Sequence, residues 1–205
     1  NTFVGQRSGY SNTTGYSNTV VGVFSMYFNT DGFTNTSIGY KTLYSNTTGY
    51  NNTAIGGSSL YSNIIGIGNT AIGIDSLYST TGNYNTAIGL NSLRGNTSGI
   101  NNTASGLNTL RSNSTGSNNI GIGYYAGYYE TGSNAFYVDN QDRTNTAGDK
   151  EGAILYGVMS ATPTSQRLKI NSNLTDNAIN YAADAQASDT YVITLDPILT
   201  AYVTG

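Results

Sequence analysis

The stretch "NNTAIGGSSLYSN", residues 51–63, contains a five-residue phrase, Asn-Thr-Ala-Ile-Gly, that returns along the chain almost unchanged. Copies begin seventeen residues apart, except for one interval of sixteen between Asn69 and Asn85. The starts are Asn1, Asn18, Asn35, Asn52, Asn69, Asn85, Asn102 and Asn119, and we expect a ninth, degenerate start at Asn134. Self-similarity at a fixed period is typical of a solenoid, in which each turn packs on its neighbours.

The repeated unit is poorly suited to a helix. Its consensus, N-T-A-I-G-x-x-S-L-Y-S-N-T-T-G-x-N, combines two Gly with Asn, Thr and Ser, which have low helix propensity. Short strands joined by Gly/Asn turns fit better. We therefore predict an all-β fold, a parallel β-roll or β-solenoid of about eight 17-residue coils. We expect two short strands per coil, one around T-A-I-G-x and one around S-L-Y-S.

Stacked coils place equivalent residues about 4.8 Å apart, so the repeated positions predict continuous columns of like side chains. Alternation along the first strand puts Ile on one face and small Ala and Gly residues on the other. The regularly placed glycines indicate positive φ or close approach of another chain. The predicted structural columns are Asn18, Asn35, Asn52 and Asn69; Ile38, Ile55, Ile72 and Ile88; Gly39, Gly56, Gly73 and Gly89; and Leu43, Leu60, Leu77 and Leu93.

Each coil contributes few aliphatic side chains to offset the ordering of seventeen residues. Further apolar burial is therefore needed, and the small residues of the Ala/Gly face would let another backbone come close. We expect lateral association with identical chains through this face. The alternative is a monomeric solenoid with a very narrow interior.

Tyrosine also recurs at one position, at Tyr27, Tyr44, Tyr61 and Tyr78, until Arg94 and Arg111 interrupt the series. This column predicts aromatic stacking at a fibre surface or in a groove between chains. The alternative is contact with a sugar or receptor through exposed ring faces. Stacked Thr residues, beginning at Thr2 and Thr19, leave ice binding as a third possibility, although Ala and Gly share their strand.

Composition argues against several classes of function. The chain has no Cys and no His, and only 9% of its residues are charged, so the usual general base, thiol nucleophile and zinc ligands are missing. We expect no enzyme activity, no cofactor and no metal. A net charge of −3 without a basic cluster argues against nucleic acid, and no apolar run is long enough for membrane insertion.

Three segments differ in composition: the repeats at 1–133, a β-rich junction at 134–175, and a linker with the start of a further β module at 176–205. Strand-like runs follow at Ala153–Met159, Arg167–Ile170 and Thr190–Leu195, and residues 175–189 suit a short helix or linker. Residues 139–152 are expected to form an exposed loop. Its acids, Asp139, Asp142, Asp149 and Glu151, are interpreted as solvated or, alternatively, as a cation site, although their spacing does not match a calcium loop.

The phrases "NTAIGGSSL", "NTAIGIDSL" and "NTAIGLNSL" resemble the head repeats of trimeric autotransporter adhesins over residues 1–133. That resemblance implies a left-handed parallel β-roll in a tight trimer, although the period here is longer than is usual in the family. "SNAFYVDNQD", "AILYGVMS" and "LKINSNL" resemble the junction after such repeats in bacteriophage tail fibres. "ASDTYVITLDPILTAYVTG", residues 187–205, is similar to the opening of a small β module of those fibres.

Together these features predict a structural segment of a virion or extracellular fibre, such as a tail-fibre shaft, that supports host-cell attachment. The alternative is a trimeric adhesin head that binds glycans or a receptor at a cell surface. The expected partners are identical chains, further segments of the same fibre, and a host surface glycan or protein. The chain begins with Asn inside the repeating phrase, so we expect it to be a piece of a longer protein.

Overall fold

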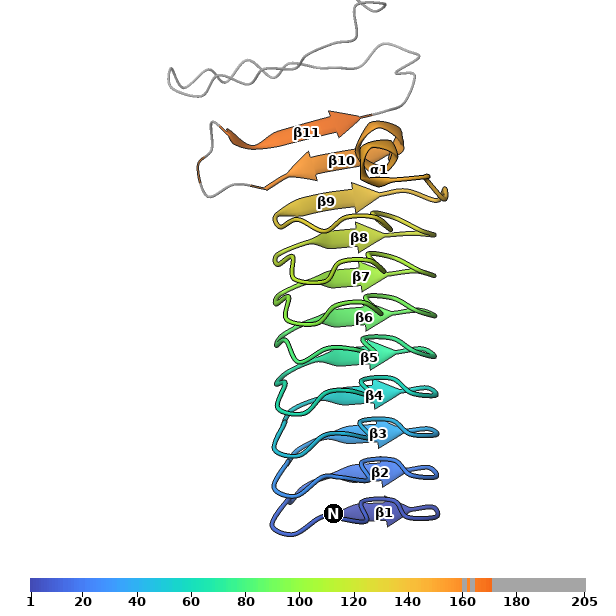
Figure 1. Cartoon of the computed structure of the whole chain (residues 1–205), viewed down its shortest axis with the longest axis vertical. Coiled ribbons are helices and arrows are strands. Elements are labelled where there is room, and N and C mark those ends of the chain that lie inside the picture. Colours follow the sequence, from blue (N-terminus) through green and yellow to red (C-terminus); the bar gives the residue numbers. More distant parts are fainter. Residues whose placement is uncertain (160–161, 163–164, 171–205) are drawn as a thin grey trace, which may run out of the picture.

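The chain forms a rod of stacked coils with one sheet running along its length (Figure 1). This computed structural model describes residues 1–159, 162 and 165–170. Eleven strands lie in the sheet in the order of the sequence, and the first eight, of three residues each, pair in parallel, one to a coil. They are β1 Thr2–Val4, β2 Thr19–Val21, β3 Thr36–Ile38, β4 Thr53–Ile55, β5 Thr70–Ile72, β6 Thr86–Ile88, β7 Thr103–Ser105 and β8 Ile120–Ile122. The predicted β-solenoid of about eight coils is confirmed.

Equivalent residues of neighbouring coils lie side by side in the sheet. Thr53 pairs with Thr70, Ala54 with Ala71, and Ile55 with Ile72. Because a parallel sheet in this register places each position of the repeat beside its own copy, every coil can reuse the same contacts.

The coils that begin at Asn69 and Asn119 are one residue shorter than the rest. Because the second of them is short, the predicted start of the ninth coil at Asn134 is wrong by one residue. The Ala135 backbone N–H donates to Oδ1 of Asn119, the bond that the first residue of each inner coil makes. Asn134 instead has a φ of 63° and donates its N–H to the Ser117 carbonyl, as the last residue of a coil does. The ninth coil therefore begins at Ala135. Asparagine also occupies the last position of several coils, so Asn134 resembles the start of a coil without being one.

The alanine face of the strands points into the coil and the isoleucine face points outward, which differs from the prediction. The central residues Ala54, Ala71, Ala87 and Ala104 are fully buried inside their own coils, whereas Ile38, Ile72 and Ile88 point outward and remain 38%, 36% and 43% exposed. The seventeen-residue coil encloses a space that holds only a small side chain opposite the buried leucine. The prediction that chains associate through the Ala/Gly face is therefore wrong for the alanines, because that face is already filled.

The S-L-Y-S segment is a turn rather than a second strand. Leu43, Leu60, Leu77 and Leu93 are fully buried but have φ between 46° and 52°, in the left-handed region. This backbone costs about 1–2 kcal/mol in a non-glycine residue. Burial of the leucine side chain offsets that cost by about 1.5–3 kcal/mol. The turn also keeps its bonds to the next coil, since the Leu60 N–H donates to the Ser76 carbonyl over 3.0 Å.

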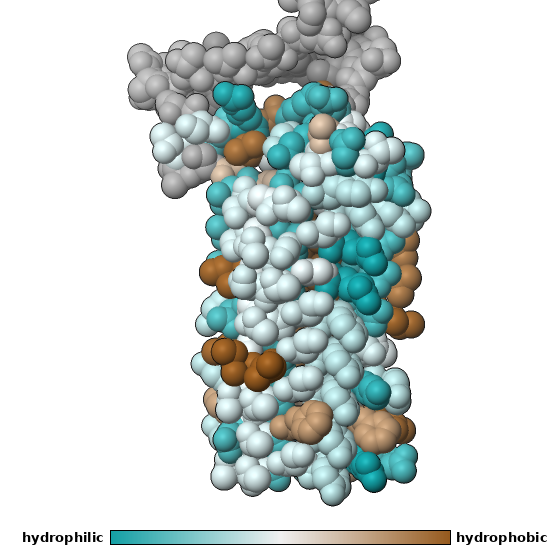
Figure 2. Space-filling model, viewed as in Figure 1, coloured by the Kyte–Doolittle hydropathy of each residue, from teal (hydrophilic) through white to brown (hydrophobic). Residues whose placement is uncertain are grey.

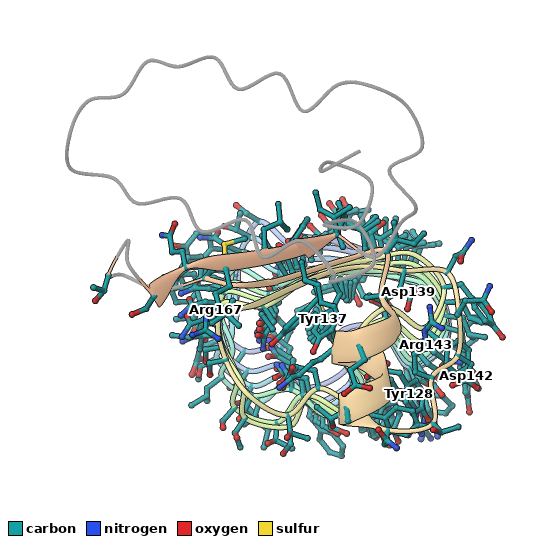
Figure 3. The ribbon with its side chains drawn as sticks, turned by 90° about the horizontal axis from the view of Figure 1, so that it is seen from above. Tyr128, Tyr137, Asp139, Asp142, Arg143 and Arg167 are labelled. Atoms are coloured by element: carbon teal, nitrogen blue, oxygen red, sulfur yellow. The ribbon has the colours of Figure 1, made fainter. Side chains whose placement is uncertain are left out.

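A C-terminal cap closes one end of the rod (Figure 3). It consists of β9 Ala135–Val138, which is parallel to β8, the helix α1 Thr146–Gly152, and the antiparallel strands β10 Leu155–Val158 and β11 Arg167–Ile170. Seen along the rod, α1 covers part of the coil interior and Tyr137 points into it. The strand-like runs predicted at 153–159 and 167–170 contain β10 and β11.

The exposed loop predicted for residues 139–152 is wrong, because this segment contains α1 and buries Asp139 and Asp149. The linker predicted at 175–189 and the strand predicted at Thr190–Leu195 lie outside the described residues. Within the described part of the chain, no helix has the length and apolarity needed to cross a bilayer.

Candidate functional surfaces

The first asparagine of each coil makes two kinds of hydrogen bond that hold the rod together. The Asn52 backbone N–H donates to Asn35 Oδ1 over 3.0 Å, which links neighbouring coils. Asn52 Nδ2 donates to the Gly66 carbonyl over 2.8 Å, which closes the coil on itself. Both bonds recur at Asn18, Asn35, Asn69, Asn85, Asn102 and Asn119. The position needs one acceptor and one donor on a short side chain, which asparagine supplies.

A second buried asparagine column, which the sequence analysis missed, lies on the return path of each coil. Asn46 Nδ2 donates to Asn29 Oδ1 over 2.7 Å and to the Gly49 carbonyl over 3.1 Å. Its asparagines are Asn12, Asn29, Asn46, Asn63, Asn96 and Asn113. Thr80 interrupts the column in a short coil, and Asn63 Oδ1 is left buried without a partner among the described residues. The same period of seventeen could have revealed this column.

The glycine column marks where consecutive coils come closest. Gly56 has a φ of 115°, and a Cβ built on it would lie 2.8 Å from the carbonyl carbon of Gly73. Gly39, Gly73 and Gly89 have φ between 129° and 136°. The close neighbour is therefore the next coil of the same chain, so this column is a requirement of the fold and not a contact with another chain.

The four predicted tyrosines form one continuous stack. The centroids of Tyr27 and Tyr44 are 5.5 Å apart, those of Tyr44 and Tyr61 5.1 Å, and those of Tyr61 and Tyr78 5.0 Å, with planes within 16° of parallel. Because the ring faces cover one another, only ring edges and hydroxyls remain for other molecules. Contact with a sugar through exposed faces of these rings, one of the two interpretations of the column, is therefore wrong.

The outer face of the sheet carries a column of Thr and a column of Ile or Val, which we call the Thr/Ile face. Val4, Val21, Ile38, Ile72, Ile88 and Ile122 are 36–53% exposed. Ser105 is the one polar residue in the aliphatic column from Val4 to Ile122. The turns after β2, β5 and β6 add exposed Val23, Ile74 and Leu90 beside it. Figure 2 shows a wall of the rod that is mainly pale and teal, with brown apolar groups near its lateral edges.

A buried carboxylate joins the cap to the last full coil. Glu130 Oε2 accepts a hydrogen bond of 2.5 Å from the Tyr137 hydroxyl, and Lys150 Nζ lies 3.4 Å from the same oxygen. Burial alone would raise the pKa of Glu130. The hydrogen bonds from Tyr137 and the Gly132 N–H, together with the Lys150 charge, outweigh this, so the pKa lies below its ordinary value. Burial and the bond to Glu130 raise the pKa of Tyr137.

Asp149 of α1 takes the place of one backbone carbonyl that a complete ninth coil would supply. In an inner coil the Ser112 N–H donates to the Tyr128 carbonyl of the following coil. The equivalent N–H, that of Tyr129, donates instead to Asp149 Oδ2 over 2.7 Å, while Asp149 Oδ1 is buried without a hydrogen bond in the described part. Burial is the main cause that raises the pKa of Asp149 to about 7, and the charges of Asp139 and Glu130 add to it.

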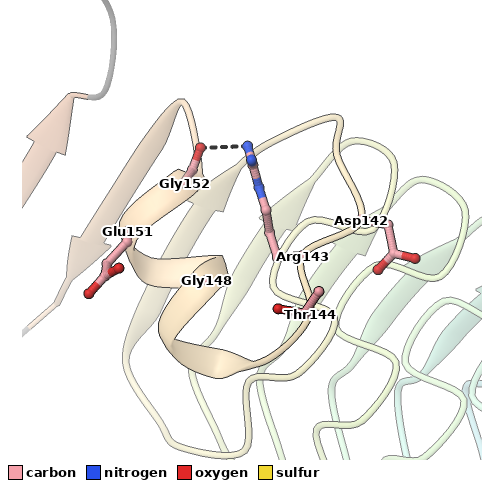
Figure 4. Close-up of a pocket in the computed structure, with 6 residues that line it drawn as sticks. All are labelled: Asp142, Arg143, Thr144, Gly148, Glu151 and Gly152. Atoms are coloured by element: carbon pink, nitrogen blue, oxygen red, sulfur yellow. Dashed lines mark hydrogen bonds between the residues drawn. The ribbon is translucent and has the colours of Figure 1, made fainter.

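A shallow depression beside α1 is lined by Asp142, Arg143, Thr144, Gly148, Glu151 and Gly152 (Figure 4). Arg143 Nε donates to Asp139 Oδ2 over 2.9 Å and Arg143 Nη2 donates to the Gly152 carbonyl over 2.6 Å, so this side chain fastens α1 to the end of β9. The four acids considered as a cation site are dispersed between this depression and the buried cap. Among the described residues, no group of three His, Cys, Asp or Glu side chains is placed to hold a metal ion.

Comparison of the chain with protein-family models, with curated proteins and with solved structures finds no match. The columns, the Thr/Ile face and the cap are therefore the observations from which function is inferred.

Proposed function

We propose that this chain is a shaft segment of a virion or extracellular fibre, in which three copies associate through the Thr/Ile face. The observation that carries the proposal is the aliphatic column that runs from β1 to β8 on the outside of the sheet. Scattered exposed aliphatic residues are common on soluble proteins, but a contiguous apolar strip marks an interaction surface. The resemblance of the repeats to trimeric fibre heads supports a threefold assembly.

The repeat allows a single kind of contact between chains to be used many times. The first six strands each present Thr and an Ile or Val outward in the same register, so one favourable contact between chains can recur along most of the rod. Eight coils at about 4.8 Å each give a rod of roughly 40 Å. The rod would serve as a long and stiff spacer. Each chain packs against its two neighbours, so that unfolding is slow. A fibre of this kind would hold a binding tip away from the particle or cell and so support host attachment.

The experiment is the mass of the purified chain in solution, by light scattering after size exclusion. We expect a trimer for the chain and a monomer for the double variant Ile55→Asp/Ile72→Asp. The matched control is Ile65→Asp, at a residue 59% exposed on a different wall of the coil, which should stay trimeric. Circular dichroism of the monomer should retain the β signal. A monomeric native chain, or a trimeric double variant, would contradict the proposal.

One observation favours a second candidate function, ice binding, on the same face. Ala54 and Ala71 point inward, so the outer surface of these strands presents only Thr and Ile in regular rows, and alanine no longer argues against an ice-binding array. The two candidates compete for one face, because a trimer buries it. Thermal hysteresis from a monomeric chain would favour ice binding, and a trimer without hysteresis would exclude it.

A further inference from the structure

All four cationic side chains of residues 1–133 lie on one ridge of the coil, away from the strands. We define the tyrosine ridge as the column Tyr10, Tyr27, Tyr44, Tyr61, Tyr78, Arg94, Arg111 and Tyr128, with Arg7 and Lys41 beside it. The Arg7 guanidinium lies 5.8 Å from the Tyr10 centroid, and Lys41 Nζ lies 5.5 Å from that of Tyr44. Figure 3 shows Tyr128 at the rim of the coil that faces away from the strands.

Of the three carboxylates in the same segment, only Asp75 pairs with a cation of this ridge. Asp75 pairs with Arg94 at 3.4 Å, Asp31 bonds to Thr14 in another column, and Glu130 is buried under the cap. Arg7, Lys41 and Arg111 make no salt bridge within residues 1–159. A chain with a net charge of −3 thus concentrates positive charge along a single line.

The densest part of this line is the pair Arg94 and Arg111 on consecutive coils. Arg94 lies 5.0 Å from the centroid of Tyr78 below it, and Arg111 Nη1 donates to the Tyr128 hydroxyl above it over 2.6 Å. Two like charges one coil apart repel each other unless an anion lies between them. Two buried polar atoms at this point, Arg111 Nε and Asn108 Oδ1, have no hydrogen-bond partner in the described part, and Asn108 is only 8% exposed.

We propose that the tyrosine ridge binds a linear carboxylated polysaccharide lengthwise, with Arg94 and Arg111 holding one carboxylate between them and Lys41 and Arg7 holding others further along. Guanidinium groups match carboxylate geometry, and the hydroxyls and ring edges of the half-buried ridge tyrosines suit sugar hydroxyl groups. Cations on coils one, three, six and seven fit a sparsely charged polymer. Nucleic acid fits less well, because its bases need free ring faces and these rings cover one another.

This inference does not depend on the proposed trimer, because the ridge and the Thr/Ile face lie on different walls of the coil. The test is binding of the purified chain to polygalacturonate, with dextran as the neutral polymer and single-stranded DNA as the other polyanion, by calorimetry at several salt concentrations. We expect binding to polygalacturonate that weakens with salt, no binding to dextran, and at least tenfold weaker binding to DNA.

The double variant Arg94→Gln/Arg111→Gln should weaken polygalacturonate binding at least tenfold. Lys41→Gln, whose ammonium lies over the rings of Tyr40 and Tyr44, should weaken it about two- to fivefold, and it serves as the test if the double variant does not fold. Arg167→Gln, an exposed cation in β11 outside the ridge, is the matched control and should bind like the unaltered chain. Failure of the chain to bind polygalacturonate, equal binding to DNA or dextran, or unchanged binding by the ridge variants would each overturn the proposal.

Discussion

The Phe3 ring occupies the space that a side chain on Gly9 would need. A Cβ on Gly9 would lie 2.6 Å from Phe3 Cε1. Inner coils instead carry a small residue at the position of Phe3 and a leucine at the position of Gly9, as in Ala54 and Leu60. At the other end the ring comes from the following coil, since a Cβ on Gly127 of the eighth coil would lie 2.7 Å from Cδ2 of Tyr137 in the ninth. An aromatic ring therefore replaces the leucine of the interior at both ends of the described array.

This complementarity predicts a strongly non-additive pair of substitutions. Gly9→Leu alone should destabilise the first coil, because the leucine meets the ring, and Phe3→Ala alone should leave a hollow. The double variant recreates the inner-coil pair, and the φ of 57° at Gly9 is close to that of the inner leucines. We expect the double variant to be more stable than the two single effects predict by about 1 kcal/mol or more. Chemical unfolding of the four proteins measures this, and simple additivity would contradict it.

The cap should make stability depend on pH through Asp149. Its pKa of about 7 in the folded chain exceeds the ordinary 3.8, so between these values the folded chain holds a proton that the unfolded chain has lost. The free energy of unfolding should therefore fall as pH rises from 5 to 7, by about 2–3 kcal/mol, and level off above. The lowered pKa of Glu130 acts in the opposite direction, but only below its ordinary value of 4.5.

Asp149→Asn tests this assignment. The amide oxygen can still accept the Tyr129 N–H, but the side chain no longer titrates, so unfolding monitored between pH 5 and 8 should lose most of its slope. Asp142→Asn, at an exposed acid of the same segment, should keep the slope of the unaltered protein. Equal slopes in all three proteins would show that another group is responsible.

Removing one asparagine of the first column should weaken the whole stack. Asn52→Ala deprives the buried Asn69 N–H of its partner. It also removes the shorter of the two hydrogen bonds that the buried Gly66 carbonyl accepts, leaving only the one from Asn63 Nδ2. A buried donor without a partner costs about 1–3 kcal/mol and the loss of one further hydrogen bond about 1 kcal/mol, so we expect a loss of about 3 kcal/mol in unfolding free energy. Asn140→Ala, at an exposed asparagine in the cap, should change it by less than about 0.5 kcal/mol. A loss at Asn52 no larger than at Asn140 would mean that the column contributes little.

The repeat alone predicted the stacking, because a fixed period requires equivalent residues to meet, and Thr53 does lie beside Thr70. Which side of the strand faces inward could not be predicted, because alternation separates Ala54 from Ile55 without saying which one the coil can enclose. That depends on how tightly seventeen residues close, and the closure depends on the left-handed turn at Leu60. A leucine in this conformation leaves no signal in a single sequence.

The cap was harder to predict for a related reason. Its acids lie close together in sequence and suggest a solvated loop, but their roles are set by where the coils end. Asp149 replaces a carbonyl that the next coil would have supplied, and Asp139 binds Arg143. Only the geometry of the last coil shows which backbone groups need such partners.

Two adjacent glycines provide the sharpest test of the stacked-coil geometry. Gly56 has a φ of 115° and its Cβ would lie 2.8 Å from Gly73, whereas a Cβ on Gly57 would meet nothing within 4 Å and its φ is not positive. Gly56→Ala should therefore destabilise the chain by about 2–4 kcal/mol, from backbone strain and displacement of the next coil. Gly57→Ala should be neutral or stabilising by up to about 1 kcal/mol, because alanine restricts the unfolded chain. Thermal unfolding of the two variants should shift in opposite directions or differ widely, and equal shifts would mean that consecutive coils do not approach each other at Gly56.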